Sequence, residues 1–139
     1  MIIHRQCVGI DISKDTFTAS ICKRDQQDSL CYSEIQSFDN QKKGFNQLMR
    51  WARKHLDSKA DMLFLMEATG VYYEPLAHHL HKIKQRVCVV LPNTSKHYFR
   101  SLNIKTKTDA VDAKVLSRMG VERKHGMWSP PPQNLLEKR

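Results

Sequence analysis

The sequence has no long hydrophobic run, no closely spaced pair of cysteines and a deficit of acidic residues. No apolar stretch approaches the roughly twenty residues that a membrane-spanning helix requires, and the opening MIIHRQCVGID has neither the length nor the cleavage pattern of a signal peptide. We therefore expect a cytoplasmic protein with no membrane partner. The cysteines stand singly within apolar runs, which favours reduced, buried thiols over disulfides or a zinc site. They are Cys7, Cys22, Cys31 and Cys88.

Acidic side chains are outnumbered, because the chain has 14 Asp and Glu against 23 Lys and Arg and a net charge of +9. The basic residues occur in every segment instead of forming one charged tail. Such an excess favours a polyanionic partner, and nucleic acid is the commonest one. With 139 residues and 40% hydrophobic content, the chain has the size and composition of one domain with a substantial core.

The first part of the chain has the pattern of three short strands. Residues 6–12, 16–24 and 30–38 are rich in residues that favour strands, and turn residues separate them. Short connections between consecutive strands predict an antiparallel meander. From Asn40 the period changes, because apolar residues then recur at helical spacing, and Asn40 or Asp39 is the expected helix cap.

The second part alternates continuous apolar runs with amphipathic segments, a pattern typical of parallel strands buried between helices. In chain order it predicts a strand ending at Glu67, a helix over 72–85, a strand over 86–91, and helices over 93–102 and 106–120. Thr106 or Thr108 is the expected cap of the last helix, and Gly120 its end. The predicted fold class is α/β: a mixed sheet in which a three-strand antiparallel meander precedes parallel strands, with helices on its faces.

Residues 121–139 differ in character from the rest. They include three consecutive prolines, 130–132, and too few periodic apolar residues to build a core. This composition predicts a linker or docking arm that follows a domain over residues 1–120. Trp128, beside the prolines, is a candidate to dock on a partner protomer.

Four acidic residues stand where sites in α/β proteins form. Asp11 and Glu67 each end a predicted strand, and sites collect at the carboxyl ends of strands. Asp109 and Asp112 are three residues apart and share one face of the last helix. Each acid also has a structural explanation: a turn former, a strand-end cap, or a pair neutralised by nearby lysines. Because an unpaired charge beside apolar strands is costly to bury, the four together favour a shared function.

Carboxylates that converge on one point raise one another's pKa values unless divalent cations are bound. Oxygen ligands suit Mg²⁺ or Mn²⁺ better than zinc, and two such ions can support phosphoryl transfer. Basic side chains near the aspartate pair are then expected to bind the nucleic-acid backbone. These are Lys96, Arg100, Lys105, Lys107 and Lys114.

Three segments carry a resemblance to a known family: VGIDISKDTF (8–17), MEATGVYYEPLAHHL (66–80) and VLPNTSKHYFRSLNIKTKTDAVDAKVLSRM (90–119). In this order they are similar to the amino-terminal domain of the insertion-sequence transposases related to the Piv and MooV DNA invertases, and the likeness covers residues 6–120. That domain resembles RuvC and has the ribonuclease H fold. The family's catalytic, metal-binding DEDD tetrad maps onto Asp11, Glu67, Asp109 and Asp112.

The resemblance implies a DNA transposase or recombinase that breaks and rejoins strands during transposition. Related members are guided by a structured RNA that pairs with donor and target DNA. In that family a second, carboxy-terminal domain carries a serine nucleophile and works with the tetrad across a multimer. Because this sequence lacks that domain, we assign no serine the nucleophile's role. We expect a fragment that binds Mg²⁺ and nucleic acid, is weak or inactive alone, and forms a dimer or tetramer in the full-length protein.

Three other interpretations stay open. A stand-alone tetrad can nick DNA as RuvC-like nucleases do. A non-catalytic nucleic-acid-binding module of the same fold would use the acids only for structure. A sugar kinase or actin-like ATPase also ends its first strand in an acid, but the segment DISKD lacks the glycine that lets such a hairpin approach phosphates.

Overall fold

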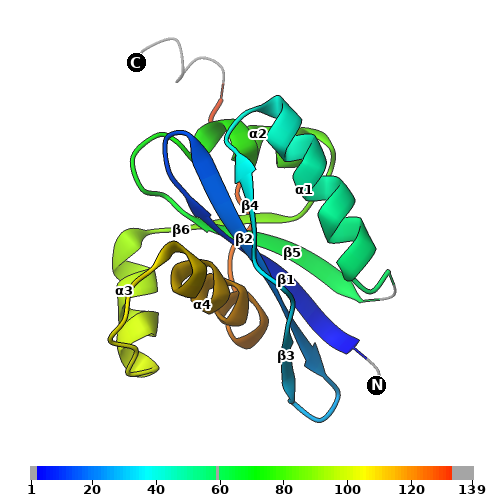
Figure 1. Cartoon of the computed structure of the whole chain (residues 1–139), viewed down its shortest axis with the longest axis vertical. Helices are drawn as coiled ribbons and strands as arrows, with labels where there is room; N and C mark the ends of the chain where they lie inside the picture. The colour runs from blue at the N-terminus through cyan, green and yellow to red at the C-terminus, as the bar shows by residue number, and fades with distance from the viewer. Residues whose placement is uncertain (1–2, 59, 133–139) are drawn as a thin grey trace.

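The apolar runs of the sequence pair into one six-stranded sheet with helices on both faces (Figure 1). The computed structural model describes residues 3–58 and 60–132. The strands are β1 (Ile3–Ile12), β2 (Thr16–Asp25), β3 (Leu30–Tyr32), β4 (Gln36–Asp39), β5 (Asp61–Glu67) and β6 (Val87–Val90). Their order is β3-β2-β1-β5-β6, and β4 also pairs with β2. Because β2 is antiparallel to β1 while β5 and β6 run parallel to it, the predicted mixed α/β sheet is confirmed.

The predicted third strand is interrupted at Ser33. The Ser33 Oγ accepts a hydrogen bond from the Ile21 N–H at 2.9 Å, and the Ser33 N–H donates to the Ile21 carbonyl at 2.8 Å. Tyr32 pairs with Cys22 of β2, and Gln36 pairs with Ala19 of β2. Four residue steps on this segment therefore correspond to three on β2. The extra residue leaves the ladder as in a β-bulge, so one predicted strand becomes β3 and β4.

The helices form two layers, one on each face of the sheet (Figure 1). They are α1 (Lys42–His55), α2 (Glu74–Lys82), α3 (Pro92–Ser101) and α4 (Asp109–Glu122). On one face, Leu48 of α1 and Leu80 of α2 share a core with Ile10 of β1. On the other, Leu116 of α4 shares a core with Cys7 of β1. Since alternate residues of a strand point to opposite faces, β1 supplies both cores.

Neither Asn40 nor Asp39 caps α1 as predicted. The N-cap position is Gln41, whose side chain makes no capping bond. The Asn40 Nδ2 instead donates to the backbone carbonyls of Ser13 and Tyr72, at 3.0 Å each. Asn40 therefore ties the loop after β1 to the loop after β5.

Helix α4 begins as predicted but ends later. Thr108 is its cap, because the Thr108 Oγ1 accepts a hydrogen bond from the Val111 N–H at 3.1 Å. Gly120 does not end the helix, which continues to Glu122. A Cβ at Gly120 would overlap the side chain of Cys7 on β1. This glycine therefore serves a close contact and not a chain reversal.

A second glycine completes the contact between α4 and β1. A Cβ at Gly9 would overlap the backbone nitrogen of Ser117 and the backbone carbonyl of Ala113. Residues 113–117 thus lie over Gly9, and Gly120 lies over Cys7, two positions earlier in the strand. Helix α4 consequently runs antiparallel along β1, and its first turn reaches the carboxyl end of the strand.

Residues 123–132, here called the C-terminal arm, pack against the domain that precedes them. The backbone N–H of Trp128 donates to the Val87 carbonyl of β6 at 2.7 Å. Its ring meets His78 and His81 of α2 edge-on, with centroids 5.0 and 6.0 Å apart. The expectation that Trp128 docks on a partner protomer is therefore wrong for this structure. The predicted domain boundary at residue 120 stays a prediction.

Three of the four cysteines are buried as predicted, but Cys31 on the edge strand β3 is exposed. Burial raises the pKa of the Cys22 thiol to about 12 and that of Cys88 to about 11. Both thiols are therefore protonated at neutral pH. Within the described ranges, no helix combines the length and apolar character needed to cross a bilayer.

Replacing Gly9 by alanine is expected to lower the free energy of unfolding by about 1–3 kcal/mol, because the new Cβ overlaps backbone atoms that cannot rotate away. Urea denaturation measures this change. Gly126→Ala is the matched control, since a Cβ there meets no atom within 4 Å. Equal losses in the two variants would contradict the close packing of α4 on β1.

Candidate active site

The carboxyl ends of β1 and β5 bring Asp11 and Glu67 to the same level of the sheet. The strands are parallel, and their register pairs the two residues that directly precede these acids. The first turn of α4 carries Asp109 and Asp112 over this end, because the helix runs antiparallel along β1. The acids predicted from the sequence thus share one end of the fold.

The pKa of Asp11 shows how closely the acids approach. Burial of the carboxyl group is the largest cause that raises this pKa from 3.8 to about 7, and a hydrogen bond with Asp109 is the next. The negative charges of Asp112, Asp109 and Glu67 raise it further. Asp11 is therefore partly protonated at neutral pH, and in this form it can donate the hydrogen bond to Asp109.

Asp112 shows the same crowding from the helix side. Burial raises its pKa most, and the charges of Glu67 and Asp109 add to the effect. Lys107 opposes it, with its Nζ 3.7 Å from the Asp112 Oδ2. The Asp112 Oδ1 is buried and has no hydrogen-bond partner within the described part of the chain. An unpartnered buried carboxylate oxygen is a position that a cation would stabilise.

Two hydroxyl groups that the sequence did not point to hold Glu67. The Thr69 Oγ1 donates to one carboxylate oxygen and the Ser95 Oγ to the other, each at 2.7 Å. Ser95 lies in the first turn of α3 and is 1% exposed. Thr69 follows Glu67 by two residues, so local sequence could have suggested it. Ser95 is 28 residues away, and no local pattern links it to the acid.

The basic residues predicted near the acids fall into two groups. Lys107 lies beside Asp112 and 5.3 Å from the ring centroid of Phe99, whereas Lys114 lies 4.6 Å from the ring centroid of Tyr32. Lys107 therefore neutralises part of the charge of Asp112, as the structural explanation of the aspartate pair predicts. The remaining three are Lys96 and Arg100 on α3 and Lys105 in the loop before α4, and all five basic residues are exposed.

The acids suit a hard divalent cation, although they do not form a closed ligand set. Across residues 3–58 and 60–132, no three His, Cys, Asp or Glu side chains make a group that could hold a metal ion as they stand. The hydrogen bond between Asp11 and Asp109 occupies oxygens that such an ion would need. The donor chemistry nevertheless fits, because carboxylate oxygens are what Mg²⁺ and Mn²⁺ prefer, and the Asp112 Oδ1 is available.

Comparison with protein families shows which family the chain belongs to. A family model for transposases of the IS110 type with a DEDD motif, described as "Transposase", matches residues 8–137. The chain belongs to this transposase family. It is similar to the pilin gene-inverting proteins of Moraxella bovis and Moraxella lacunata, with 34% identity over 130 residues. The match covers 94% of this transposase chain but 38% of each relative, so the chain spans well under half of their length.

Solved structures confirm the predicted RuvC-like, ribonuclease H-like fold. The RuvC structure of Thermus thermophilus matches 81% of this chain and 90% of its own, with a TM-score of 0.56 and 8% identity. The yeast mitochondrial Holliday junction resolvase matches 84% and 78%, with a TM-score of 0.57 and 11% identity. The fowlpox virus resolvase, in complex with Holliday junction DNA, matches 81% and 95% at a TM-score of 0.50 and 16% identity. Likeness at such low identity shows the fold alone.

Asp11 is expected to make stability depend on pH in the absence of divalent metal. Its pKa is about 7 in the folded state and about 3.8 when unfolded, so the folded protein keeps a proton that the unfolded chain releases between these values. Asp11 therefore lowers the free energy of unfolding as the pH rises from about 4 to about 7. Asp11→Asn removes this dependence and is expected to be more stable than the wild type at about pH 8.

Urea denaturation of the two proteins across this pH range measures the difference. Asp15→Asn, in the exposed turn after β1, controls for the loss of one aspartate. If the curves of the wild type and Asp11→Asn ran parallel over the whole range, the crowding of carboxyl groups around Asp11 would be wrong.

Proposed function

We propose that this chain is the metal-binding catalytic part of a DNA transposase and that it acts with Mg²⁺ or Mn²⁺ in DNA strand cleavage and rejoining. The observation that carries the proposal is the convergence of four carboxyl groups at the carboxyl ends of β1 and β5, in a chain of this family. They are Asp11, Glu67, Asp109 and Asp112. Clustered carboxyl groups among which some pKa values are raised, here those of Asp11 and Asp112, are typical of a functional site.

The residues of the site have distinct parts in holding the cations. Asp11 gives up its proton, since only ionised carboxylates bind metal well. Asp112 offers its unpartnered Oδ1, and Glu67 is oriented by its two hydroxyl donors. When bound, divalent cations supply the positive charge that activates an attacking oxygen and stabilises a leaving oxygen in phosphoryl transfer.

Nucleic acid is the proposed partner of this site. The net charge of +9 attracts phosphate groups, and Lys96, Arg100 and Lys105 are exposed and free to contact a backbone. The names of similar proteins support DNA as the substrate, since they describe gene inversion and Holliday junction complexes. We further propose that a structured RNA guides the full-length protein, that it assembles as a dimer or tetramer, and that a second domain supplies the serine nucleophile.

A second candidate function is a stand-alone nuclease. The match extends over 90% of the Thermus thermophilus RuvC chain, so a domain of about this extent makes up nearly the whole of that protein. Nicking of duplex or branched DNA by the 139-residue chain with Mg²⁺ would favour this candidate over a fragment that depends on a second domain. Nucleic-acid binding without any metal dependence would favour a non-catalytic module.

Mg²⁺ or Mn²⁺ is expected to raise the thermal unfolding midpoint of the wild type and to have no such effect on Asp112→Asn. A ligand that binds only the folded state stabilises it by mass action, and the variant loses the oxygen that has no other partner. Differential scanning fluorimetry with increasing metal concentration measures both midpoints. Asp61→Asn, an exposed acid at the other end of the sheet, is the control and should respond like the wild type. An unchanged midpoint in the wild type at saturating metal, with DNA present, would overturn the metal site.

Ser95→Ala is expected to raise the metal concentration needed for half of the full stabilisation by about tenfold, because partners that orient metal ligands contribute on this scale. The variant removes one of the two hydroxyl donors to Glu67. Ser101→Ala, on the same helix with its hydroxyl bonded to a backbone carbonyl, is the matched control. If both variants lost overall stability but kept the wild-type metal response, Ser95 would have only a structural role.

A further inference from the structure

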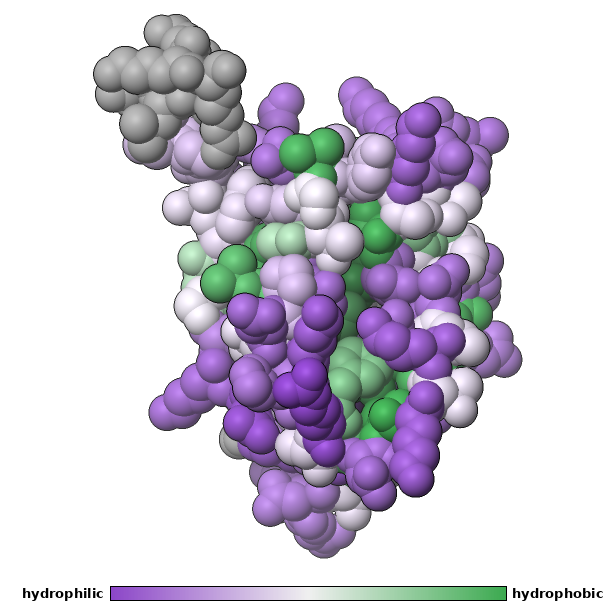
Figure 2. Space-filling view, turned by 90° about the vertical axis from the view of Figure 1, so that its left-hand side faces the viewer, coloured by the Kyte–Doolittle hydropathy of each residue, from purple (hydrophilic) through white to green (hydrophobic). Residues whose placement is uncertain are grey.

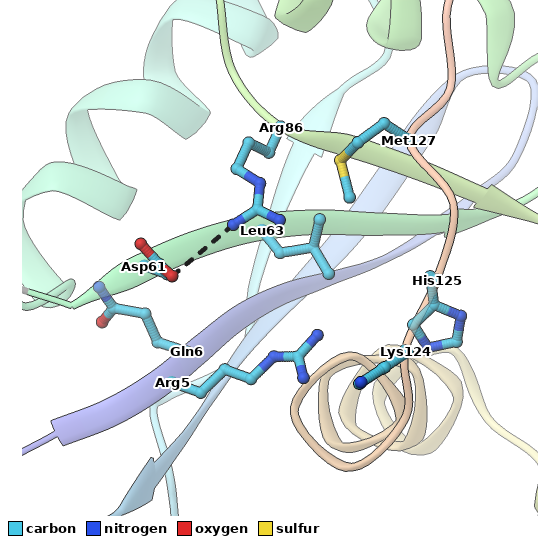
Figure 3. A pocket seen from close by; sticks show the side chains of 8 residues that line it. All are labelled: Arg5, Gln6, Asp61, Leu63, Arg86, Lys124, His125 and Met127. Carbon is cyan, nitrogen blue, oxygen red and sulfur yellow. Dashed lines mark ion pairs between the residues drawn. The ribbon is translucent and has the colours of Figure 1, made fainter.

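A pocket of about 420 Å³ lies at the end of the sheet opposite to the carboxyl groups (Figure 3). The starts of β1, β5 and β6 form one side, and the first residues of the C-terminal arm form the other. Its charged and titratable lining residues are Arg5, Asp61, Arg86, Lys124 and His125. Figure 3 shows the Arg5 side chain extending from β1 toward Lys124 and the end of α4. We call this site the basic pocket.

Positive charge outweighs negative charge in the basic pocket. Asp61 is the one acid among its described lining residues. The Asp61 Oδ2 lies 3.9 Å from the Arg86 Nη1, and the acid's side chain is 84% exposed. An exposed ion pair at this distance contributes little, so Arg86 can turn to another anion. Arg5 and Lys124 add two further positive charges.

The wall between the pocket and α4 is already ordered. The Arg5 Nη2 donates to the Arg123 carbonyl at 3.2 Å. The His125 Nε2 lies 3.1 Å from the Met119 carbonyl, which also accepts a hydrogen bond from the Arg123 N–H at 2.9 Å. Trp128 anchors the other end of this short segment on β6. Arg5 is therefore held in place before an anion binds, and this lowers the conformational entropy that its side chain loses on binding.

The polar floor of the pocket is internally satisfied. Gln6 is 1% exposed, and its Nε2 donates to the backbone carbonyls of Asp57 and Ala60. Its Oε1 accepts a hydrogen bond from the Asp57 N–H at 2.9 Å. Gln6 therefore shapes the floor, and the basic side chains remain as the donors for a ligand.

The basic surface continues beyond the pocket. A second hollow of about 370 Å³ between α3 and α4 shares Lys124 and His125 with the first and adds His97 and Arg123. Figure 2, which looks onto the side of the molecule that carries α3, shows that hydrophilic side chains predominate on this side. A run of shared basic residues across two hollows fits an extended polyanion better than a single small ion.

The basic pocket lies at a fixed distance from the carboxyl groups. It contains the first residue of β5, Asp61, while Glu67 is the last residue of the same strand. The strand is seven residues long, so six residue steps separate its ends by about 20 Å. Duplex DNA rises about 3.4 Å per base pair, so this distance corresponds to about six base pairs.

We propose that the basic pocket, formed by Arg5, Arg86 and Lys124, binds a backbone phosphate of nucleic acid about 20 Å from the carboxyl groups. The assignment of nucleic acid as the ligand rests on the proposed function, whereas the preference for an anion rests on the pocket itself. The pocket holds the backbone in place and takes no part in the chemistry. Its contacts do not distinguish base sequences, because they reach only the backbone.

The test measures binding of the 139-residue chain to a labelled DNA duplex by fluorescence anisotropy, without divalent metal. A duplex of about twenty base pairs is several times longer than the distance between the two sites. We expect each of the variants Arg5→Gln, Arg86→Gln and Lys124→Gln to raise the dissociation constant about threefold or more. Each should also lower by about one the number of counterions released on binding, which the slope of log Kd against log salt concentration measures. Asp61→Asn is expected to tighten binding, since it removes the acid of the pocket.

Arg53→Gln and Lys54→Gln, exposed at the end of α1 on the other face, are the matched controls. They remove the same charge and are expected to weaken binding less. Equal weakening in controls and pocket variants would overturn the proposal, because it would mean that only net charge matters. Unchanged or weaker binding by Asp61→Asn would also count against it. Arg86 and Lys124 are exposed, so their variants keep the test valid if Arg5→Gln does not fold.

A titration with inorganic phosphate separates the two possible sources of the anion. Saturation of the pocket by free phosphate, with duplex binding unaffected by the pocket variants, would overturn nucleic acid as the ligand. The metal response of the thermal midpoint is measured on the same variants. A selective loss of duplex binding in proteins that show no metal response would support the pocket while contradicting the proposed function.

Discussion

The close contact between α4 and β1 is the constraint on which the rest of this molecule depends. Two glycines, Gly9 in the strand and Gly120 in the helix, let the backbones approach where any side chain would overlap. The helix then lies antiparallel along the central strand over nearly its whole length. Its first turn comes to rest over the carboxyl end of β1, and its last residues reach the start of the same strand, where the Arg123 carbonyl meets Arg5.

Electrostatic balance at the carboxyl end follows from that placement. Packing places Asp109 and Asp112 against Asp11 and Glu67, so burial and like charge act together. Without a divalent cation, the proton on Asp11 and the ammonium group of Lys107 offset part of the repulsion. Neither is permanent, because Asp11 can release its proton and the exposed side chain of Lys107 can turn away from Asp112. In the proposed function, a bound divalent cation takes the place of both.

The other end of the sheet has the opposite character. The C-terminal arm crosses the edge of β6 and is anchored by Trp128, which covers an edge strand that would otherwise present unpaired backbone groups. The same crossing brings Lys124 to the start of the strands beside Arg5 and Arg86. The fold thus separates an acidic end from a basic end by the length of one strand.

Local sequence by itself indicated the order of helices and strands apart from the division of the third strand, limited the cap of α4 to Thr106 or Thr108, and pointed to the four acids, since periodicity, capping and motif spacing act over a few residues. It misjudged Gly120, because glycine signals the end of a helix locally whereas here it serves a contact with a strand more than a hundred residues earlier. It gave no sign of Ser95 as a partner of Glu67, since their hydrogen bond spans 28 residues. Only the tertiary structure decided which side chains meet at each end of the sheet, because that depends on how closely two backbones can pack.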